Sequence, residues 1–417
     1  MIIYPFFVII SMVMFMKLKI IDMDHNGRGI AKIDGKVCFI ENALIGEEVD
    51  ANIYLDKKKH MEAKVNSILV SSDKRVKEKC KYASICGGCN IMNMDYQNQI
   101  LYKKNKVIEI FKKFCKSEIK IDEFISGNEL YYRNKLTLHI DKKIGLYANK
   151  TKDIIEINEC LIVNKKINEI YSIIKTCDLS NISTILIRVG VNTNESMVVV
   201  ETNFDIFDLK NKLNNIIDTL VVKRNDEFIT LFGNGYIYEK LNGLNFLISP
   251  DSFFQVNTLQ AEKLYSKVKE YLGKSNNVLD LYCGTGTIGI YVSDIAQSVL
   301  GIEINKYAVK DANENKKINN INNIEFICGD SEKVLYKINR NFDSVIVDPP
   351  RSGLGEKVVQ QLLKINPKKI VYVSCDPITL ARDINYLSSN YELVNISLVD
   401  MFPNTHHVEC VAVLKLK

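Results

Sequence analysis

The chain has 417 residues, 47% of them hydrophobic, which is enough for two or three domains with ordinary buried cores. Its formal net charge of +5 is compatible with a nucleic-acid partner but does not by itself indicate one. The 11 cysteines are an odd number in a long chain without a clear export signal, which argues against a disulfide-stabilised secreted protein. We therefore expect free thiols or metal ligands in a cytoplasmic protein.

Residues 1–16 are an almost wholly apolar extension, and an ordinary soluble pattern begins at Lys17. A membrane-spanning helix needs roughly 20 apolar residues, and an export signal needs a basic start, so neither pattern is complete. We expect a mis-assigned start, with Met14 or Met16 as the true one. A signal or anchor and a docked apolar arm remain the alternatives. We expect no membrane partner and no obligate protein partner.

Residues 17–70 predict a small β-barrel of the OB type. Short strand-like segments alternate with glycine turns such as Asn26–Gly29. The predicted strands are Met16–Ile21, Val37–Ile40, Glu47–Tyr54 and Met61–Val70. Such barrels commonly bind single-stranded nucleic acid, although a purely structural barrel would show the same pattern.

Residues 71–250 predict a central α+β domain with a largely antiparallel sheet. It begins with an irregular cysteine-rich stretch, and Asp95 to Lys116 then has the spacing of a basic amphipathic helix. β-Branched residues alternate with polar ones in the remainder, as in Lys135 to Ile140.

Residues 251–417 predict a Rossmann-like domain, because apolar strands alternate with polar helices, as in a doubly wound parallel sheet. A helix from Leu259 to Leu272 precedes the first strand. The last two strands, Glu392–Val399 and Val408–Leu416, predict an antiparallel hairpin at the sheet edge. The whole chain is thus expected to be a multidomain α/β protein.

A glycine-rich turn at Val278–Gly289 predicts a nucleotide-like ligand, because glycine lets the backbone approach it closely. Asp280 precedes the glycines, where it would repel a pyrophosphate but suits a cationic, amino-acid-bearing ligand. Glu303 ends the next strand, where a carboxylate can bind ribose hydroxyls, and Asp330 ends the third strand, at the adenine position. These features favour S-adenosylmethionine over a dinucleotide.

Two further strand ends carry reactive side chains, Asp348–Arg351 and Ser374–Pro377. The thiol at the second of these strand ends suggests covalent chemistry on a nucleobase. Carbon 5 of uracil, for example, is too weak a nucleophile to take a methyl group directly. A thiolate that adds to carbon 6 activates carbon 5, and a base must then remove the carbon-5 proton. Cys375 provides the thiol, and residues 401–409 offer candidate bases. A cysteine at a strand end can also be simply a small buried hydrophobe.

These motifs together resemble the bacterial RNA uracil-5-methyltransferase family over residues 17–417. The matching segments are Phe253–Asn257, Asp280–Gly286, Asp348–Gly353, Ser374–Pro377, Asp400–Pro403 and His407–Glu409. The resemblance implies that Cys375 is the nucleophile and Glu409 the proton acceptor. It also places Gln255, Tyr282, Glu303 and Asp348 at cofactor-site or target-site positions. Asp376 departs from the family pattern, where asparagine is more usual.

Cys80, Cys86 and Cys89 are clustered, and Cys160 follows at a distance. Four thiolates suit zinc or an iron–sulfur cluster, and three close cysteines with one remote are more typical of a cluster. The ribosomal branch of the resembled family implies a [4Fe-4S] cluster at these four positions and an N-terminal TRAM barrel. The bacterial transfer-RNA branch generally lacks both.

We therefore expect RNA methylation in rRNA processing, with 23S ribosomal RNA as the partner. A tRNA uridine C5-methyltransferase and a non-catalytic RNA-binding protein are the alternatives. Radical methylthiotransferases also join a TRAM barrel to a cluster, but their C-x3-C-x2-C motif is absent. The barrel, the basic stretch Lys74–Lys81 and the helix bearing Lys103, Lys104 and Lys106 are expected to bind RNA phosphates.

Overall fold

The computed structural model describes residues 14–116 and 118–417, so most of the predicted apolar extension lies outside the described residues. The described chain folds into two compact units. The first contains residues 14–84, 88–99 and 404–406, and the second contains residues 85–87, 100–116, 118–403 and 407–417. Within the described ranges, no helix combines the length and the apolar character that a membrane crossing requires.

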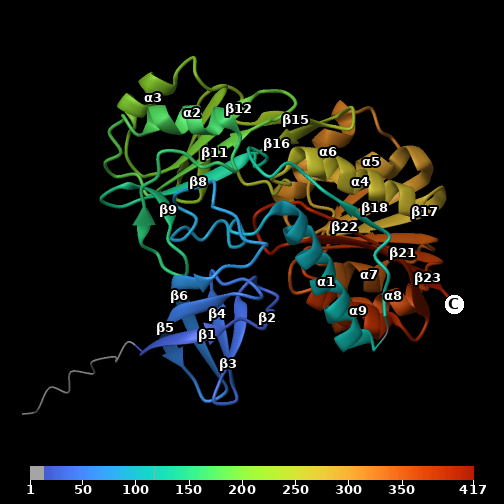
Figure 1. Ribbon diagram of the computed structural model, residues 1–417. Coiled ribbons are helices and arrows are strands. Elements are labelled where there is room, and N and C mark those ends of the chain that lie inside the picture. Colours follow the sequence, from blue (N-terminus) through green and yellow to red (C-terminus); the bar gives the residue numbers. More distant parts are fainter. Residues whose placement is uncertain (1–13, 117) are drawn as a thin grey trace, which may run out of the picture. The chain divides into compact units, whose positions relative to one another are not determined.

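The first unit is built on a six-stranded sheet with the order β1-β5-β6-β4-β3-β2, shown in blue in Figure 1. Alternate residues of its strands are buried in a common core, as the period of a β-strand requires. The glycine turn of the sequence leads directly into β3, a strand that the sequence pattern did not predict. The bounds are β1 Met14–Lys19, β2 Asp22–Met23, β3 Gly29–Ile33, β4 Lys36–Glu41, β5 Glu48–Asp56 and β6 His60–Val70.

A buried ion pair fixes the chain where it leaves this sheet. Glu47 is fully buried, and both of its carboxylate oxygens accept hydrogen bonds from the Arg75 guanidinium, at 2.5 and 2.9 Å. The backbone amides of Leu44 and Ser72 also donate to Glu47, and Arg75 donates to the carbonyl of Asn42. Arg75 is therefore a structural partner of the barrel rather than the RNA contact that its basic neighbourhood predicted.

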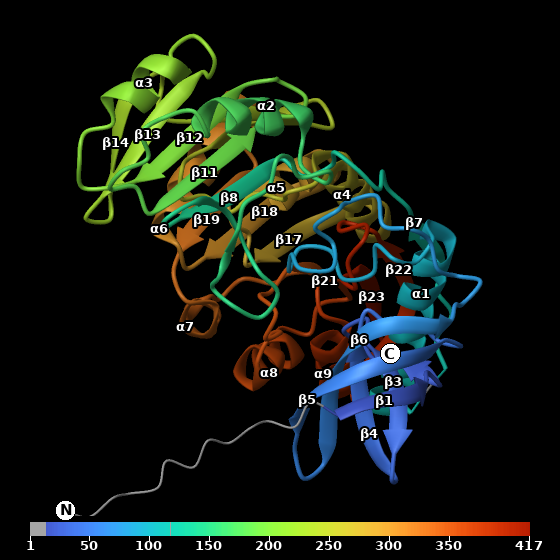
Figure 2. The same ribbon diagram turned by 60° about the vertical axis from the view of Figure 1, so that its left-hand side comes forward.

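The second unit contains a seven-stranded sheet with the order β10-β9-β8-β11-β12-β13-β14. Every pairing is antiparallel except that of β12 with β13, which confirms the predicted largely antiparallel sheet. Helices α2 and α3 lie on one face (Figure 2), and the hairpin β15–β16 follows. The bounds are β8 Lys135–Ile140, β9 Ile144–Tyr147, β10 Ile154–Ile155, α2 Lys165–Ile174, β11 Thr184–Val189, β12 Ser196–Glu201, α3 Phe207–Leu213, β13 Thr219–Arg224, β14 Glu227–Phe232, β15 Ile237–Leu241 and β16 Leu244–Ile248.

The same unit contains the doubly wound sheet, with the order β19-β18-β17-β20-β21-β23-β22-β7. Strands β17 to β21 are parallel and β23 is antiparallel to both of its neighbours. The strand bounds are β7 Glu123–Ile125, β17 Ser275–Leu281, β18 Ala296–Glu303, β19 Ile324–Cys328, β20 Ser344–Val347, β21 Lys369–Ser374, β22 Tyr391–Val399 and β23 Glu409–Leu416. The predicted hairpin exists, but it is not at the edge, because β7 pairs with β22 in parallel.

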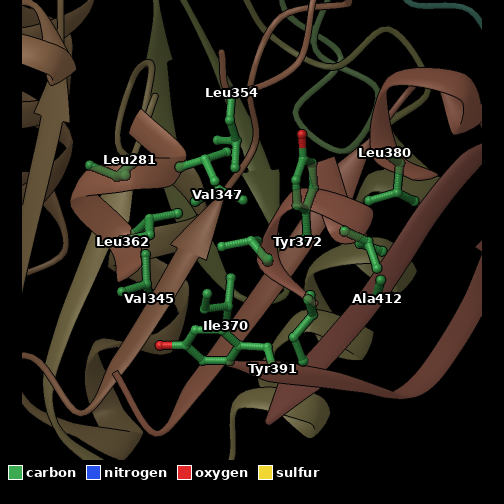
Figure 3. Close-up of a cluster of buried hydrophobic side chains, with 14 of the residues drawn as sticks. Leu281, Val345, Val347, Leu354, Leu362, Ile370, Tyr372, Leu380, Tyr391 and Ala412 are labelled. Atoms are coloured by element: carbon green, nitrogen blue, oxygen red, sulfur yellow. The ribbon is translucent and has the colours of Figure 1, made fainter. Parts of the chain in front are cut away.

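Helices cover both faces of this sheet. α1, α8 and α9 enclose one buried cluster, in which Tyr372 and Leu380 point toward the same interior (Figure 3). α4 and α5 cover the other face, and the cluster there extends to Met197 and Val221 of the seven-stranded sheet. The helix bounds are α1 Tyr96–Cys115, α4 Thr258–Leu272, α5 Thr287–Val292, α6 Lys306–Ile318, α7 Ser331–Lys337, α8 Glu356–Ile365 and α9 Pro377–Leu387.

Glu47→Ala should destabilise the first sheet strongly, because it leaves Arg75 and two amides without their buried acceptor. The expected loss of local stability is about 3–5 kcal/mol, measured as hydrogen-exchange protection of the β5 and β6 amides. Glu48→Ala is the matched control, since Glu48 pairs with Lys17 at the surface. Equal protection in the two variants would contradict the structural role of Glu47.

Candidate functional site

The turn between β17 and α5 has the backbone that its glycines predicted. Tyr282, Gly284 and Gly286 all have positive φ angles, of 62°, 54° and 78°. A Cβ atom at Gly286 would lie 2.6 Å from Cζ of Phe326, so the turn has no room for a side chain there. Tyr282 reaches out of the turn, and its hydroxyl donates to the carbonyl of Leu354 at 3.4 Å.

Two carboxylates end the neighbouring strands. Glu303, at the end of β18, accepts hydrogen bonds from the backbone amides of Gly284 at 3.1 Å and Asn305 at 2.8 Å, so it lies directly against the glycine turn. Asp330, after β19, is the N-cap of α7 and accepts from the amide of Glu332 at 3.0 Å. The structure thus brings Glu303 to the turn, whereas one oxygen of Asp330 is already engaged in capping a helix.

Asp280 is completely buried beneath the same turn, and neither of its carboxylate oxygens has a hydrogen-bond partner. Desolvation, reinforced by the nearby charge of Asp348, raises the pKa of Asp280 to about 8, although the nearby Gly289 amide, which lies outside hydrogen-bonding geometry, opposes this shift. A buried carboxylate without a partner fits a cationic ligand, whose positive charge would stabilise the ionised form.

Two further predicted cofactor residues, Gln255 before the glycine turn and Asp348 after it, are both largely removed from solvent. Asp348 follows β20, its amide donates to the Leu281 carbonyl at 3.4 Å, and burial raises its pKa to about 7. Gln255 is 8% exposed, and its carbonyl accepts a hydrogen bond from Asn134. Gln255 is followed by Asn257, the N-cap of α4.

The register of β21 and β23 brings together the thiol and the carboxylate that the sequence singled out. Ser374 pairs with Cys410 across these antiparallel strands. Cys375, one residue beyond Ser374, and Glu409, one residue before Cys410, are therefore neighbours at the same end of the sheet. Asp376 caps α9 by accepting from the amides of Ile378 and Thr379, which an asparagine could also do.

Burial dominates the titration of this pair. Desolvation and the charge of Glu409 raise the pKa of Cys375 to about 12. Desolvation and the charge of Asp348 raise the pKa of Glu409 to about 8. By contrast, desolvation and neighbouring cations lower the pKa of His407 to about 4. Glu409 is thus the stronger base of the two candidates near the thiol.

Arg351 also acts on this pair, although in the sequence it stands out only as part of a motif. Its positive charge lowers the pKa of both Cys375 and Glu409, against the larger effect of burial. Its exposed side chain follows Asp348 and the two prolines at the end of β20. Its position after the end of a parallel strand could have identified Arg351 from the sequence, because doubly wound sheets bind their ligands at these strand ends.

The four predicted metal ligands are divided between the two units. Cys80 and Cys89 belong to the first unit, and Cys86 and Cys160 to the second. Among residues 14–116 and 118–417, no three or more His, Cys, Asp or Glu side chains are grouped as metal ligands would be. The iron–sulfur prediction therefore rests on the cysteine spacing and the resemblance alone.

One lysine of the predicted RNA-binding helix has a different role. Lys103 is fully buried, and its ammonium group contacts Asp400 at 2.6 Å. An amphipathic helix usually exposes its lysines, but this one points into the protein interior. Lys103 therefore cannot neutralise an RNA phosphate, and this prediction was wrong.

Comparisons with known proteins agree with the geometry. Residues 95–417 match the family described as tRNA (Uracil-5-)-methyltransferase, and residues 16–65 match the TRAM domain. The chain is 35% identical to an RNA methyltransferase of Staphylococcus aureus strain COL, over 95% of this chain and 97% of that protein. It is 36% identical to an RNA methyltransferase of Caldanaerobacter subterraneus, over 96% of this chain and 97% of the relative.

A solved structure is similar over almost the entire chain. It is the tRNA (uracil-54, C5)-methyltransferase of Pyrococcus abyssi in complex with S-adenosyl-L-homocysteine. Its TM-score is 0.80 at 30% identity, and the match covers 96% of this chain and 99% of that one. The chain therefore belongs to the tRNA (uracil-5-)-methyltransferase family, and it is an S-adenosylmethionine-dependent RNA methyltransferase with an N-terminal TRAM domain and a Rossmann-like catalytic fold.

Proposed function

We propose that the protein methylates carbon 5 of a uridine through a covalent bond between Cys375 and carbon 6 of the base, with Glu409 removing the carbon-5 proton. The observation that carries this proposal is the β21–β23 register, which makes a thiol and a strongly basic carboxylate neighbours. A uridine buried in RNA structure must leave its stack to reach them.

The proposed reaction has three steps, and side chains of this chain act in the first and the last. The Cys375 thiolate adds to carbon 6, and the electrons of the carbon 5–carbon 6 double bond shift to give an enolate. When bound, S-adenosylmethionine would supply the methyl group to carbon 5 of this enolate, and its methyl–sulfur bond would break to leave S-adenosylhomocysteine. Glu409 then takes the carbon-5 proton, the double bond reforms, and the sulfur–carbon bond breaks to return the thiolate. The Arg351 cation favours the charged forms of both residues, which these steps require.

The cofactor is assigned to Gln255, Tyr282, Glu303, Asp330 and Asp348. Glu303 is the ribose ligand in this assignment, because it is held against the glycine turn by the Gly284 amide. Asp330 would bind the cofactor while it also caps α7. Asp280 acts from below the turn by balancing the positive charge of the ligand.

The substrate proposed here is 23S ribosomal RNA, supported by the four-cysteine pattern of the ribosomal branch. Transfer RNA is the second candidate. The Pyrococcus abyssi enzyme, which is described as a tRNA methyltransferase, matches 96% of this chain, so the overall architecture alone does not exclude tRNA.

The cysteine residues and the domain limits complete the proposal. A [4Fe-4S] cluster is proposed to be bound by Cys80, Cys86, Cys89 and Cys160.

The proposed domains are the barrel at 17–70, the central domain at 71–250 and the catalytic domain at 251–417, in a cytoplasmic protein. These limits are close to the TRAM match at 16–65, while the catalytic-family match at 95–417 also takes in most of the central domain.

Cys375→Ala and Glu409→Gln should fail at different steps. The alanine variant should bind S-adenosylmethionine but form no covalent RNA adduct, because the nucleophile is missing. The glutamine variant should add its thiol and transfer the methyl group, and then accumulate a methylated protein–RNA adduct. Denaturing gels with labelled RNA measure the adduct, and the rate of product release should fall by about 100-fold or more.

Cys38→Ala is the matched control, since Cys38 is a buried cysteine in the core of the first unit, and it should not prevent adduct formation. Full turnover by Cys375→Ala would refute the covalent mechanism. Loss of activity in Glu409→Gln without any adduct, in a folded protein, would remove Glu409 from its proposed role as the base.

Asp280→Asn should weaken S-adenosylmethionine binding by about 10-fold to 100-fold, because a charge-assisted interaction is lost. In the unmodified protein Asp280 and Asp348 are largely protonated at about pH 6, so affinity should rise from about pH 6 to about pH 9 as Asp348 and then Asp280 ionise. The variant should retain only the Asp348 part of this rise. Calorimetric titration measures both effects, and Asp294→Asn, at a surface ion pair, is the control. Unchanged affinity in Asp280→Asn would contradict the charge-balancing role.

Purified enzyme should methylate a uridine in 23S ribosomal RNA and leave tRNA transcripts unmodified. Mass mapping of both RNAs after incubation with labelled cofactor identifies the substrate. Methylation of tRNA alone would favour the second candidate.

Protein purified without oxygen should contain about four irons per chain. Its iron and sulfide content and its visible absorption measure the cluster, and Cys160→Ser should lower the iron content while the surface variant Cys328→Ser should not. Stoichiometric zinc, or no metal at all, would reject the cluster.

A further inference from the structure

The loop between β22 and β23 is held by side chains from three distant segments of the second unit. Four successive backbone carbonyls, at residues 400–403, each accept a hydrogen bond from a different side chain. The pairs are Gln260 Nε2 to Asp400 at 3.2 Å, Asn257 Nδ2 to Met401 at 3.1 Å, Lys103 Nζ to Phe402 at 3.1 Å, and Tyr132 Oη to Pro403 at 3.0 Å. We call residues 400–403 the clamped segment.

Irregular backbone is rarely buried, because its polar groups then need partners. The clamped segment meets this need with side chains rather than with a sheet ladder. Asp400 and Met401 are fully buried, and the Asp400 amide donates to the Ile125 carbonyl of β7 at 2.9 Å. The conformation of this loop is therefore dictated by residues elsewhere in the chain.

Lys103 is the charged member of this set. Besides the Phe402 carbonyl, its ammonium group contacts the Asp400 carboxylate at 2.6 Å, and neither side chain has any exposed surface. A buried ion pair adds little net stability compared with apolar residues of similar size. Its charges and hydrogen bonds nevertheless require one specific geometry, so it can select a single loop conformation.

The clamped segment stands a few residues before Glu409 in the sequence. Strand β23 begins at Glu409, and its register with β22 also starts there, with Val399 opposite Glu409. Val399 immediately precedes Asp400. Asp400 of the buried ion pair is thus bonded to the residue that lies opposite Glu409 in the β22–β23 register. The same strand β23 presents the Glu409 carboxylate beside Cys375.

We propose that Lys103, through Asp400 and the Phe402 carbonyl, is a positioning residue that holds Glu409 where it can remove the carbon-5 proton. This inference rests on the proposed function. It predicts a defect in proton removal, with thiol addition and cofactor binding preserved, when the ion pair is lost.

The test uses Lys103→Met in the full-length protein, with RNA containing either uridine or 5-fluorouridine at the target. With fluorine at carbon 5 there is no proton for a base to remove. The reaction then stops after thiol addition and methyl transfer, so the fluorinated RNA reports these two steps alone. With uridine RNA, turnover should fall by about 100-fold, the effect of misplacing a catalytic group by a small distance, and a methylated adduct should accumulate. With 5-fluorouridine RNA, the rate of adduct formation should stay within about threefold of the unmodified protein, a change too small to indicate a lost catalytic interaction.

Lys103→Met removes the ammonium group that pairs with the buried Asp400 carboxylate, which can prevent folding. Lys103→Met/Asp400→Asn removes both charges and is the second variant, with its thermal unfolding measured alongside. Lys113→Met, at an exposed position on the same helix, is the control and should be unaffected.

Normal turnover of uridine RNA by the folded double variant would overturn the proposal. An equal loss with both RNAs in that variant would also overturn it, because the defect would then precede proton removal. Absence of an adduct between the unmodified enzyme and 5-fluorouridine RNA is a separate outcome, which would refute the covalent function itself and this inference with it.

Discussion

The antiparallel pairing of β21 with β23 is the constraint on which the proposed chemistry depends. β21 ends the parallel series of a doubly wound sheet, and β23 returns beside it from the far side of β22. A shift of one residue would turn the Glu409 side chain to the opposite face of the sheet. Residues Cys410 to Leu414 of β23 are buried on both faces of the sheet, so such a shift would exchange the side chains that pack in the two cores and is opposed by that packing.

The site concentrates acidic groups and shields them from water. The pKa values of Asp280, Asp348 and Glu409 are all raised, each chiefly by desolvation. Carboxyl groups with such raised pKa values are partly protonated at neutral pH. A bound cation would favour their ionised form, so they would release protons when it binds. A sulfonium cofactor is such a cation. The same electrostatic environment therefore suits a cationic cofactor and retains a basic carboxylate beside Cys375.

Local pattern was sufficient to predict most of the catalytic sheet, because its strands are continuous apolar runs and its helices end at recognisable residues such as Gly273. The glycine turn and Glu303 could also be placed, since both lie at strand ends. The partnership of Cys375 with Glu409 came only from the family resemblance, because it depends on a strand register. Lys103 and Arg75 were misassigned for a related reason. Each is buried by a carboxylate distant in the sequence, and nothing in its own surroundings indicates that partner.

Strand β7 gives the catalytic sheet an edge that comes from outside the Rossmann-like segment. Only three residues long, it pairs with β22, while Val107 and Phe111 of α1 belong to the core beneath the same sheet. A fragment cut at residue 251 would lose both and would present β22 as an open edge above an uncovered apolar surface. Open edges of this kind promote aggregation. Evolutionary exchange of this catalytic domain between proteins would thus require the chain from α1 onward to move with it.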